Sequence, residues 1–93
     1  MERRKIIFTG HVQGVGFRMT TVMLSRRTQL AGAVRNVDGG GYNTVELIVE
    51  GETKEIDQLL ARLREHFGSF IRTMDQTQLT PVGALSPGIN ITH

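Results

Sequence analysis

The residues best suited to chemistry lie near the N-terminus, where three glycines and an arginine fall within the nine-residue run from Gly10 to Arg18. Glycine tolerates positive φ angles and has no side chain, so such a loop can turn several backbone N–H groups toward one ligand. Arg18 adds a permanent charge and a fork of donors that fits phosphate oxygens. A helix that starts after the loop would add its free N–H groups and its dipole. The run therefore predicts an anion site, most naturally for phosphate.

The segments on either side of this run have the patterns of a strand and a helix. We predict a strand over residues 3–12, because Ile6, Ile7 and Phe8 form an apolar, β-favouring segment there. We predict a helix over residues 17–29, because its apolar residues recur at helical spacing. The glycine loop would then join the end of a strand to the N-terminus of a helix.

The rest of the chain predicts a hairpin, a second helix and two further strands. The second helix is the most strongly amphipathic, because its apolar residues recur at i, i+3, i+4, i+7 and i+11 from Ile56 to Phe67. The predicted elements are strands at 33–37 and 45–50 around an Asp38-Gly39 turn, a helix capped by Thr53 and ended by Gly68, a strand within 69–79 and an edge strand at 89–91.

This order, βαββαβ with a fifth short strand, predicts an α+β fold of the ferredoxin-like kind. We expect an antiparallel sheet of four to five strands with two helices on one face, in a single domain over residues 1–93. Met19, Met23 and Met74 are expected to fill gaps in the core. Many functions occur on this fold, so the fold alone does not decide the activity.

Composition argues against several classes of site and partner. The chain has no cysteine and three scattered histidines, which excludes a disulfide framework and predicts no metal site. A net charge of +2 with four Phe, one Tyr and no Trp does not favour nucleic-acid binding. No apolar run could span a membrane, and the run after the charged N-terminal residues is too short for a signal peptide. We therefore expect a cytoplasmic protein and, without a heptad pattern or apolar seam, a monomer.

The run from Gly10 to Arg18 (GHVQGVGFR) resembles the first signature of the acylphosphatase family. The second signature also has a counterpart, from Gly32 to Asn36 (GAVRN), followed by the predicted hairpin. The order of the elements matches as well, so the resemblance extends over most of the chain. Alone, Asn36 would be interpreted as a turn residue that bonds its own backbone, and its functional interpretation depends on this resemblance.

The resemblance implies an enzyme that hydrolyses the carboxyl–phosphate bond of acyl phosphates to a carboxylate and phosphate, without a metal, a cofactor or a covalent intermediate. It implies that Arg18 binds the phosphoryl group and that Asn36 positions the attacking water. Inorganic phosphate, the product, should then inhibit competitively. The implied phosphate cradle consists of the backbone N–H groups of Gln13, Gly14, Val15, Gly16, Phe17 and Arg18.

These residue types agree with the chemistry of phosphoryl transfer. The reaction depends mainly on holding the phosphoryl group in line and offsetting charge on its oxygens. Backbone donors and Arg18 can do so without reorganising during the reaction. Since the amide of Asn36 is a poor proton acceptor, we expect an oxygen of the substrate's own phosphate to take the proton of the water. His11 lies beside the loop but has no obvious orienting partner, so it is not assigned as a general base.

The sequence departs from the family pattern at three places. Ala33 stands where the family usually has an aromatic residue, about three extra residues fall within Gly40–Thr44, and the C-terminal segment from Ile89 is a poor copy of the family's last strand. None of these differences affects Arg18 or Asn36. They concern rate and stability more than the type of reaction.

Two other functions remain open at this point. The first is a non-catalytic phosphate- or carbamoyl-phosphate-binding domain, since acylphosphatase-like domains also occur in larger maturation proteins; we expect a free-standing enzyme, because the chain stops after one domain. The second is an RNA-binding module of the same topology, which would need exposed aromatics on its central strands. The segment 45–50 has none. The physiological acyl phosphate cannot be identified, because the motif recognises only the phosphoryl end.

Overall fold

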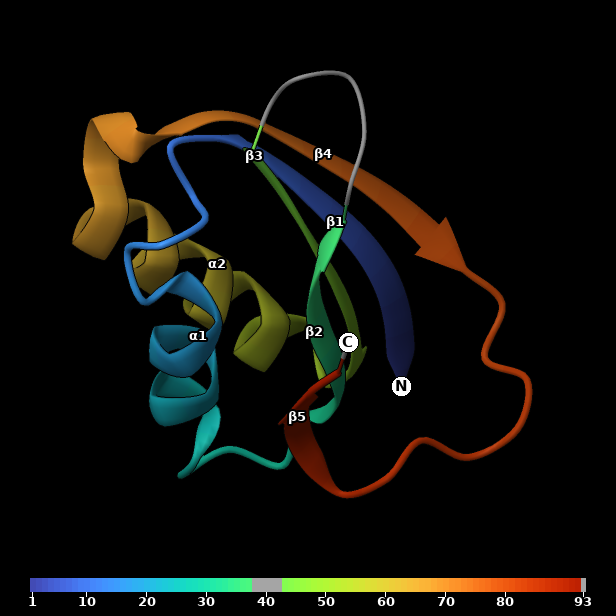
Figure 1. The fold of residues 1–93 in the computed structure, drawn as a ribbon. Helices are drawn as coiled ribbons and strands as arrows, with labels where there is room; N and C mark the ends of the chain where they lie inside the picture. The colour runs from blue at the N-terminus through green and yellow to red at the C-terminus, as the bar shows by residue number, and fades with distance from the viewer. Residues whose placement is uncertain (38–42, 93) are drawn as a thin grey trace.

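The computed structural model describes residues 1–37 and 43–92, in which a five-stranded sheet carries two helices on one face (Figure 1). The predicted Asp38-Gly39 turn, most of the expected hairpin insertion and His93 lie outside these residues. The elements are β1 (Glu2–Gly10), α1 (Phe17–Ser25), β2 (Ala31–Val37), β3 (Asn43–Gly51), α2 (Thr53–Phe67), the 3₁₀ turn η1 (Gly68–Phe70), β4 (Ile71–Leu79) and β5 (Gly88–Ile91).

The strand order β4-β1-β3-β2-β5 confirms the βαββαβ arrangement and the expected edge strand near the C-terminus. Strand β1 pairs antiparallel with β3 and β4, and β2 pairs antiparallel with β3. The antiparallel prediction is wrong for β5, which pairs parallel with β2 and makes the sheet mixed. Since β4 runs opposite to β2, β4 ends where β2 begins. A chain that crosses to the far edge from there must run beside β2 in the same direction.

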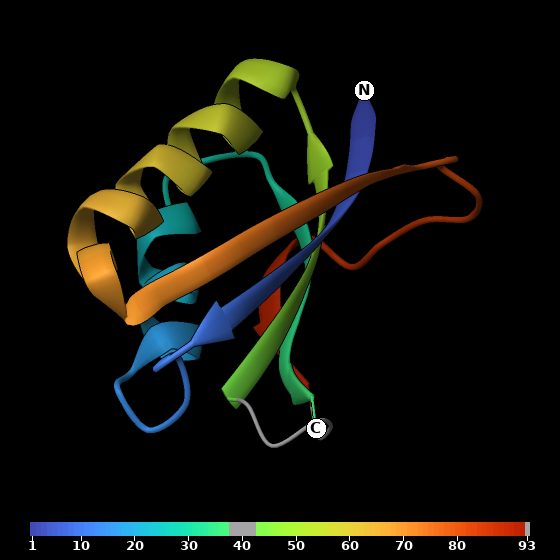
Figure 2. The same ribbon diagram turned by 90° about the horizontal axis from the view of Figure 1, so that it is seen from above.

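The core lies between the sheet and the helices (Figure 2). Alternation in β3 places Val45, Leu47 and Val49 on the helix side, where each is fully buried. The apolar stripe of α2, from Ile56 to Phe67, covers them, as its periodicity predicts. Each buried aliphatic side chain of this kind stabilises the fold by roughly 1.5–3 kcal/mol.

Three local predictions are corrected. Helix α1 ends at Ser25 instead of residue 29, because Thr28 bonds back to the Ser25 carbonyl through both its N–H (3.0 Å) and its hydroxyl (2.6 Å). Met19 and Met23 are not core residues: they are 52% and 57% exposed on α1. The N-cap of α2 is not Thr53 but the residue before it.

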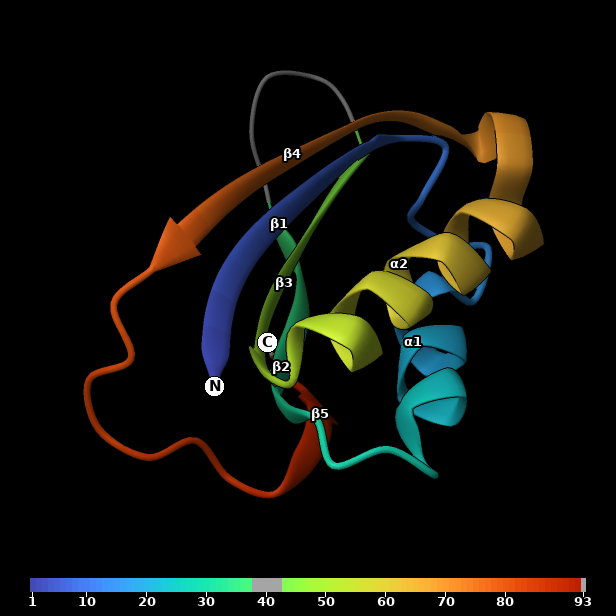
Figure 3. The ribbon, with the colours of Figure 1, turned by 180° about the vertical axis from the view of Figure 1, so that it is seen from behind.

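The N-terminal residues of β1 hold distant segments in place. Arg3 is buried on the open face of the sheet, where it donates to the carbonyls of Val82 (2.9 Å) and Gly83 (2.9 Å) in the connection from β4 to β5. Figure 3 shows this connection running across the end of the sheet. Because it leads into β5, these bonds help to fix where β5 begins.

A second ionic group ties β1 to α2. Arg4 donates to the carboxylates of Glu2 (2.8 Å) and Asp57 (2.8 Å). The hydrogen bond from Arg4, and next that from the Thr53 hydroxyl, lower the pKa of Glu2 below its ordinary value of 4.5. The hydrogen bond to Glu2 in turn raises the pKa of Arg4.

Candidate active site

The glycine loop joins the end of β1 to the first turn of α1. Its glycines Gly14 and Gly16 have φ angles of 75° and 79°, a region that side-chain-bearing residues avoid. A Cβ atom at either position would meet nothing within 4 Å. The φ angles therefore account for these glycines, and the space in front of them is open.

This loop ends at the N-terminus of α1. Gly16 is the N-cap residue of α1, and no side chain of the described residues caps the helix. The first bond within the helix runs from the Thr20 N–H to the Gly16 carbonyl at 2.9 Å. The preceding N–H groups, those of Phe17, Arg18 and Met19, come before this bond and have no partner within the helix. Together with the helix dipole they favour a negatively charged ligand.

The loop borders a hollow of about 340 Å³. Figure 2 shows the loop, the end of β2 and the C-terminus at the same end of the molecule. The hollow gathers five of the residues predicted for the site, together with Val12 of the same run and two residues that the sequence did not indicate. Its lining residues are Val12, Gly14, Gly16, Phe17, Arg18, Met19, Asn36 and Ile91.

Arg18 differs from three arginines of the sheet in having no partner among the described residues. The guanidiniums of Arg3, Arg4 and Arg35 each contact a carboxylate within 3.0 Å. Arg18 makes no side-chain hydrogen bond or ion pair with any residue of the described chain. Its charge is therefore available to a ligand in the hollow, where it is the one charged side chain among the described lining residues.

Asn36 brings an unsatisfied acceptor to the same hollow. It lies opposite Val45 in the β2–β3 register, so its side chain is on the helix face of the sheet. Its Oδ1 is buried and has no hydrogen-bond partner within the described residues. A buried polar atom without a partner costs about 1–3 kcal/mol, so such an atom in a native fold needs an explanation. A water or ligand held in the hollow would satisfy it.

Two residues predicted for the cradle support the loop from behind and do not line the hollow. The Gln13 side chain donates from Nε2 to the Thr44 carbonyl at 2.9 Å, which ties the loop to the start of β3. Thr44 pairs with Val37, the residue next to Asn36, so this bond links the loop to the strand pair that carries Asn36. Val15 is partly buried against the core.

Met19 and Ile91 are the lining residues that the sequence analysis missed. Met19 was expected in the core, yet it stands directly after Arg18 in the first turn of α1, and that position was a usable signal. Ile91 had no local signal, because only the parallel pairing of β5 with β2 brings it to the hollow.

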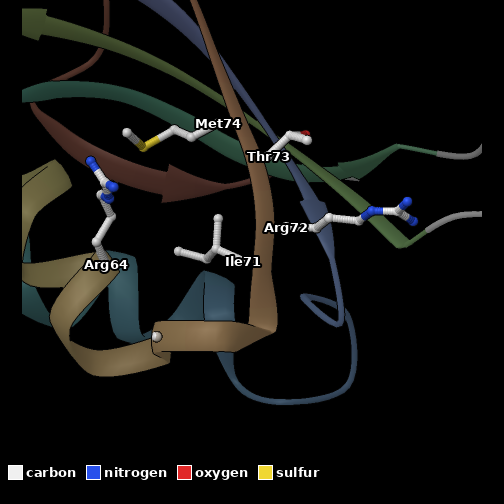
Figure 4. Close-up of a pocket in the computed structure, with 6 residues that line it drawn as sticks. Arg64, Ile71, Arg72, Thr73 and Met74 are labelled. Carbon is white, nitrogen blue, oxygen red and sulfur yellow. The ribbon is translucent and has the colours of Figure 1, made fainter.

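A second hollow, of about 430 Å³, is lined by two arginines, Arg64 and Arg72, but their guanidinium groups do not point toward the same space. It lies between the end of α2 and β4. Figure 4 shows Arg64, Ile71 and Met74 on one side of β4, while Arg72 and Thr73 point to the other side. One anion could not engage both guanidiniums in this arrangement, so this hollow is a weaker candidate for phosphate.

Metal-binding clusters and membrane-spanning helices are both absent from the described residues. The described residues contain no group of three or more His, Cys, Asp or Glu side chains arranged to hold a metal ion. Neither helix of the described chain has the length and apolar character needed to cross a membrane.

Comparison with known proteins agrees with this geometry. The sequence model of the family described as Acylphosphatase matches residues 4–85. An acylphosphatase of Corynebacterium glutamicum is 41% identical over 63 residues, which are 68% of this chain and 64% of that protein's length. The crystal structure of acylphosphatase from Bacillus subtilis superimposes over the full length of both chains, with a TM-score of 0.85 and 28% identity. The crystal structure of full-length HypF in a phosphate- and nucleotide-bound form also matches this chain, with a TM-score of 0.77 and 29% identity. The match covers 99% of this chain but only 12% of the HypF chain.

Proposed function

Because the chain belongs to the acylphosphatase family, we propose that it is an enzyme that hydrolyses the carboxyl–phosphate bond of acyl phosphates. One observation carries the proposal: two groups without partners among the described residues, the Arg18 guanidinium and the buried Oδ1 of Asn36, line the same hollow as the glycine loop. A ligand with phosphoryl oxygens and an attacking water would satisfy both.

In the proposed reaction the phosphoryl group lies against the first N–H groups of α1. The Arg18 guanidinium and these N–H groups offset the charge on the phosphoryl oxygens, which is the main requirement for phosphoryl transfer. The loop backbone needs little rearrangement, because the positive φ angles of Gly14 and Gly16 already shape it. In this proposal the loop is organised before the substrate arrives.

Asn36 has the role of placing the nucleophile. Its Oδ1 accepts a hydrogen bond from a water, whose oxygen attacks phosphorus as the bond from phosphorus to the acyl oxygen breaks. The electron pair of that bond leaves with the carboxylate, and a phosphate oxygen of the substrate takes the proton of the water. Since a carboxylate is a good leaving group, no general acid is required. Holding water and phosphorus in line supplies the rate enhancement.

Hydrolysis of benzoyl phosphate in the presence of EDTA tests this proposal. We expect wild-type turnover, competitive inhibition by inorganic phosphate, and a loss of at least about 100-fold in kcat/KM for Arg18→Ala. Arg27→Ala, which removes an exposed arginine just beyond α1, is the matched control and should retain full activity. Absence of turnover in the wild type, or equal activity in Arg18→Ala, would contradict the proposal.

A second candidate is a domain that binds phosphate or carbamoyl phosphate without turning it over. The observation that favours it is the likeness to HypF, in which a matching region makes up 12% of a much longer chain. The same experiment separates the two functions. Binding of inorganic phosphate that depends on Arg18, with no hydrolysis of benzoyl or carbamoyl phosphate, would support the second candidate.

The cytoplasmic location, the monomeric state, the single-domain organisation and the lack of a nucleic-acid partner stay predictions. The open sheet face supports the last of these predictions. The described residues that face outward from the central strands, including Lys5, Ile7, Glu46 and Ile48, provide no aromatic platform. Light scattering after size exclusion tests the monomer, and titration with a labelled RNA at low salt tests the absence of binding.

A further inference from the structure

The hollow has more room than a phosphoryl group needs. At about 30 Å³ for each water in the liquid, 340 Å³ corresponds to roughly ten waters. A phosphoryl group has only four non-hydrogen atoms. In an acyl phosphate the acyl carbon is joined to phosphorus through one bridging oxygen, so the acyl group must begin within or directly beside the same hollow.

Away from the groups that would hold the phosphoryl group and the attacking water, the solvent-accessible surface of the hollow is apolar. Val12 and Phe17 are each 1% exposed, so they form its floor. Met19 is 52% exposed and Ile91 is partly buried, and these two side chains provide the accessible apolar wall. They come from α1 and β5, which pack against each other.

The charges that line the hollow also favour a neutral, apolar acyl group. Arg18 is the one charged side chain among its described lining residues, and it is already required for the phosphoryl group. A substrate with a second anionic group, such as a second phosphate or a free carboxylate, would find no second cation among these described residues. A neutral acyl group fits the described lining better than a charged one.

We propose that Met19 and Ile91 bind the acyl end of the substrate, and that this protein prefers acyl phosphates whose acyl group is apolar, aromatic or alkyl, over small polar or anionic ones. This inference rests on the proposed hydrolase function and adds to it the chemical class of the acyl group. Methionine suits the role, since its flexible, polarisable thioether adapts to varied shapes and makes favourable contacts with aromatic rings.

The test compares benzoyl, butyryl and carbamoyl phosphates in wild type and Met19→Ala. We expect the ratio of kcat/KM for benzoyl phosphate to that for carbamoyl phosphate to fall about 5- to 20-fold in the variant, mainly through KM. The butyryl ratio should fall in the same direction. Met19→Leu, which keeps an apolar side chain of similar size, should restore most of the preference.

Met23→Ala is the matched control, because Met23 is equally exposed one turn later on α1 but does not line the hollow. It should leave all three ratios unchanged. If Arg18-dependent hydrolysis is present and Met19→Ala changes all substrates equally, or none, the inference about the acyl group is wrong while the proposed function stands. If the wild type hydrolyses no acyl phosphate, the proposed function fails, and the inference with it.

Discussion

Replacing Asn36 with leucine should stabilise the protein while removing its activity. The Oδ1 of Asn36 is buried without a partner among the described residues, so the fold must order a water in the hollow to satisfy it or carry the cost of an unsatisfied acceptor. Leucine has a similar size and no polar atom. The variant therefore separates the cost of this group to the fold from its proposed use in catalysis.

The expected stabilisation follows from that cost. An unsatisfied buried acceptor costs about 1–3 kcal/mol, and we take the lower end because Asn36 as a whole is only half-buried and a water ordered in the hollow offsets part of the cost. A gain of about 1 kcal/mol corresponds to an increase in Tm of about 4–8 °C for a domain of this size. Loss of the positioned water should reduce kcat about 100-fold or more. Inhibition by phosphate should change little, because Arg18 and the loop remain.

Urea and thermal unfolding, with benzoyl phosphate hydrolysis, measure both effects. Asn36→Ala, which cannot fill the hollow, should show the same loss of kcat and thereby exclude simple blocking. Asn90→Leu, which replaces an exposed asparagine on β5, should change the free energy of unfolding by less than about 0.5 kcal/mol. A lower free energy of unfolding in Asn36→Leu, or wild-type kcat in Asn36→Ala, would refute the reasoning.

Three further perturbations test the supports of the site. Gln13→Leu breaks the hydrogen bond to the Thr44 carbonyl. It should lower the free energy of unfolding by about 1 kcal/mol in urea unfolding, and it should lower kcat/KM by about 3- to 10-fold in steady-state kinetics. Gly16→Ala forces a side chain into a φ of 79° and should cost about 1 kcal/mol or more of stability and weaken inhibition by phosphate. Because Arg4 lowers the pKa of Glu2, this carboxylate contributes stability above pH 4.5 that is lost as the pH falls through the lowered pKa. Glu2→Gln should remove this part of the acid sensitivity, which is measured by following unfolding from pH 7 to pH 3.

Each of these variants has a matched control. Gln78→Ala removes an exposed glutamine on β4, and neither stability nor activity should change. Gly83→Ala places a side chain at a φ of 74° in open space away from the hollow, so it should lower stability without affecting phosphate inhibition. Glu65→Gln removes an exposed carboxylate on α2 and should leave the acid sensitivity as in the wild type. The assigned role would be contradicted if the control matched its variant in kcat/KM for Gln13, in phosphate inhibition for Gly16, or in acid sensitivity for Glu2.

Elements with strong local patterns were predictable from the sequence. The stripe of α2 and the alternation of β3 specify which face is buried, and the structure follows them from Ile56 to Phe67 and from Val45 to Val49. The end of α1 was not predictable from apolar spacing, because the Thr28 side chain competes for the Ser25 carbonyl.

The residues of the candidate site also fall into those that a local pattern indicated and those that only the tertiary fold brings together. Glycine spacing and Arg18 indicated the cradle, since a loop of this kind is a local feature. Asn36 was indicated only through the family resemblance, and Met19 and Ile91 were missed, because their convergence is a tertiary feature produced by β2 and β5 pairing in parallel beside α1. The sequence pattern also could not show that Gln13 supports the loop through Thr44, because that contact spans 31 positions.

A crystal structure determined in the presence of inorganic phosphate tests the central claim most directly. We predict one phosphate in the hollow between the glycine loop and Asn36, with its oxygens about 2.7–3.1 Å from the N–H groups of the first turn of α1 and from the Arg18 guanidinium. Phosphate bound instead between α2 and β4, near Arg64, or an Asn36 carboxamide fully bonded within the protein, would contradict it.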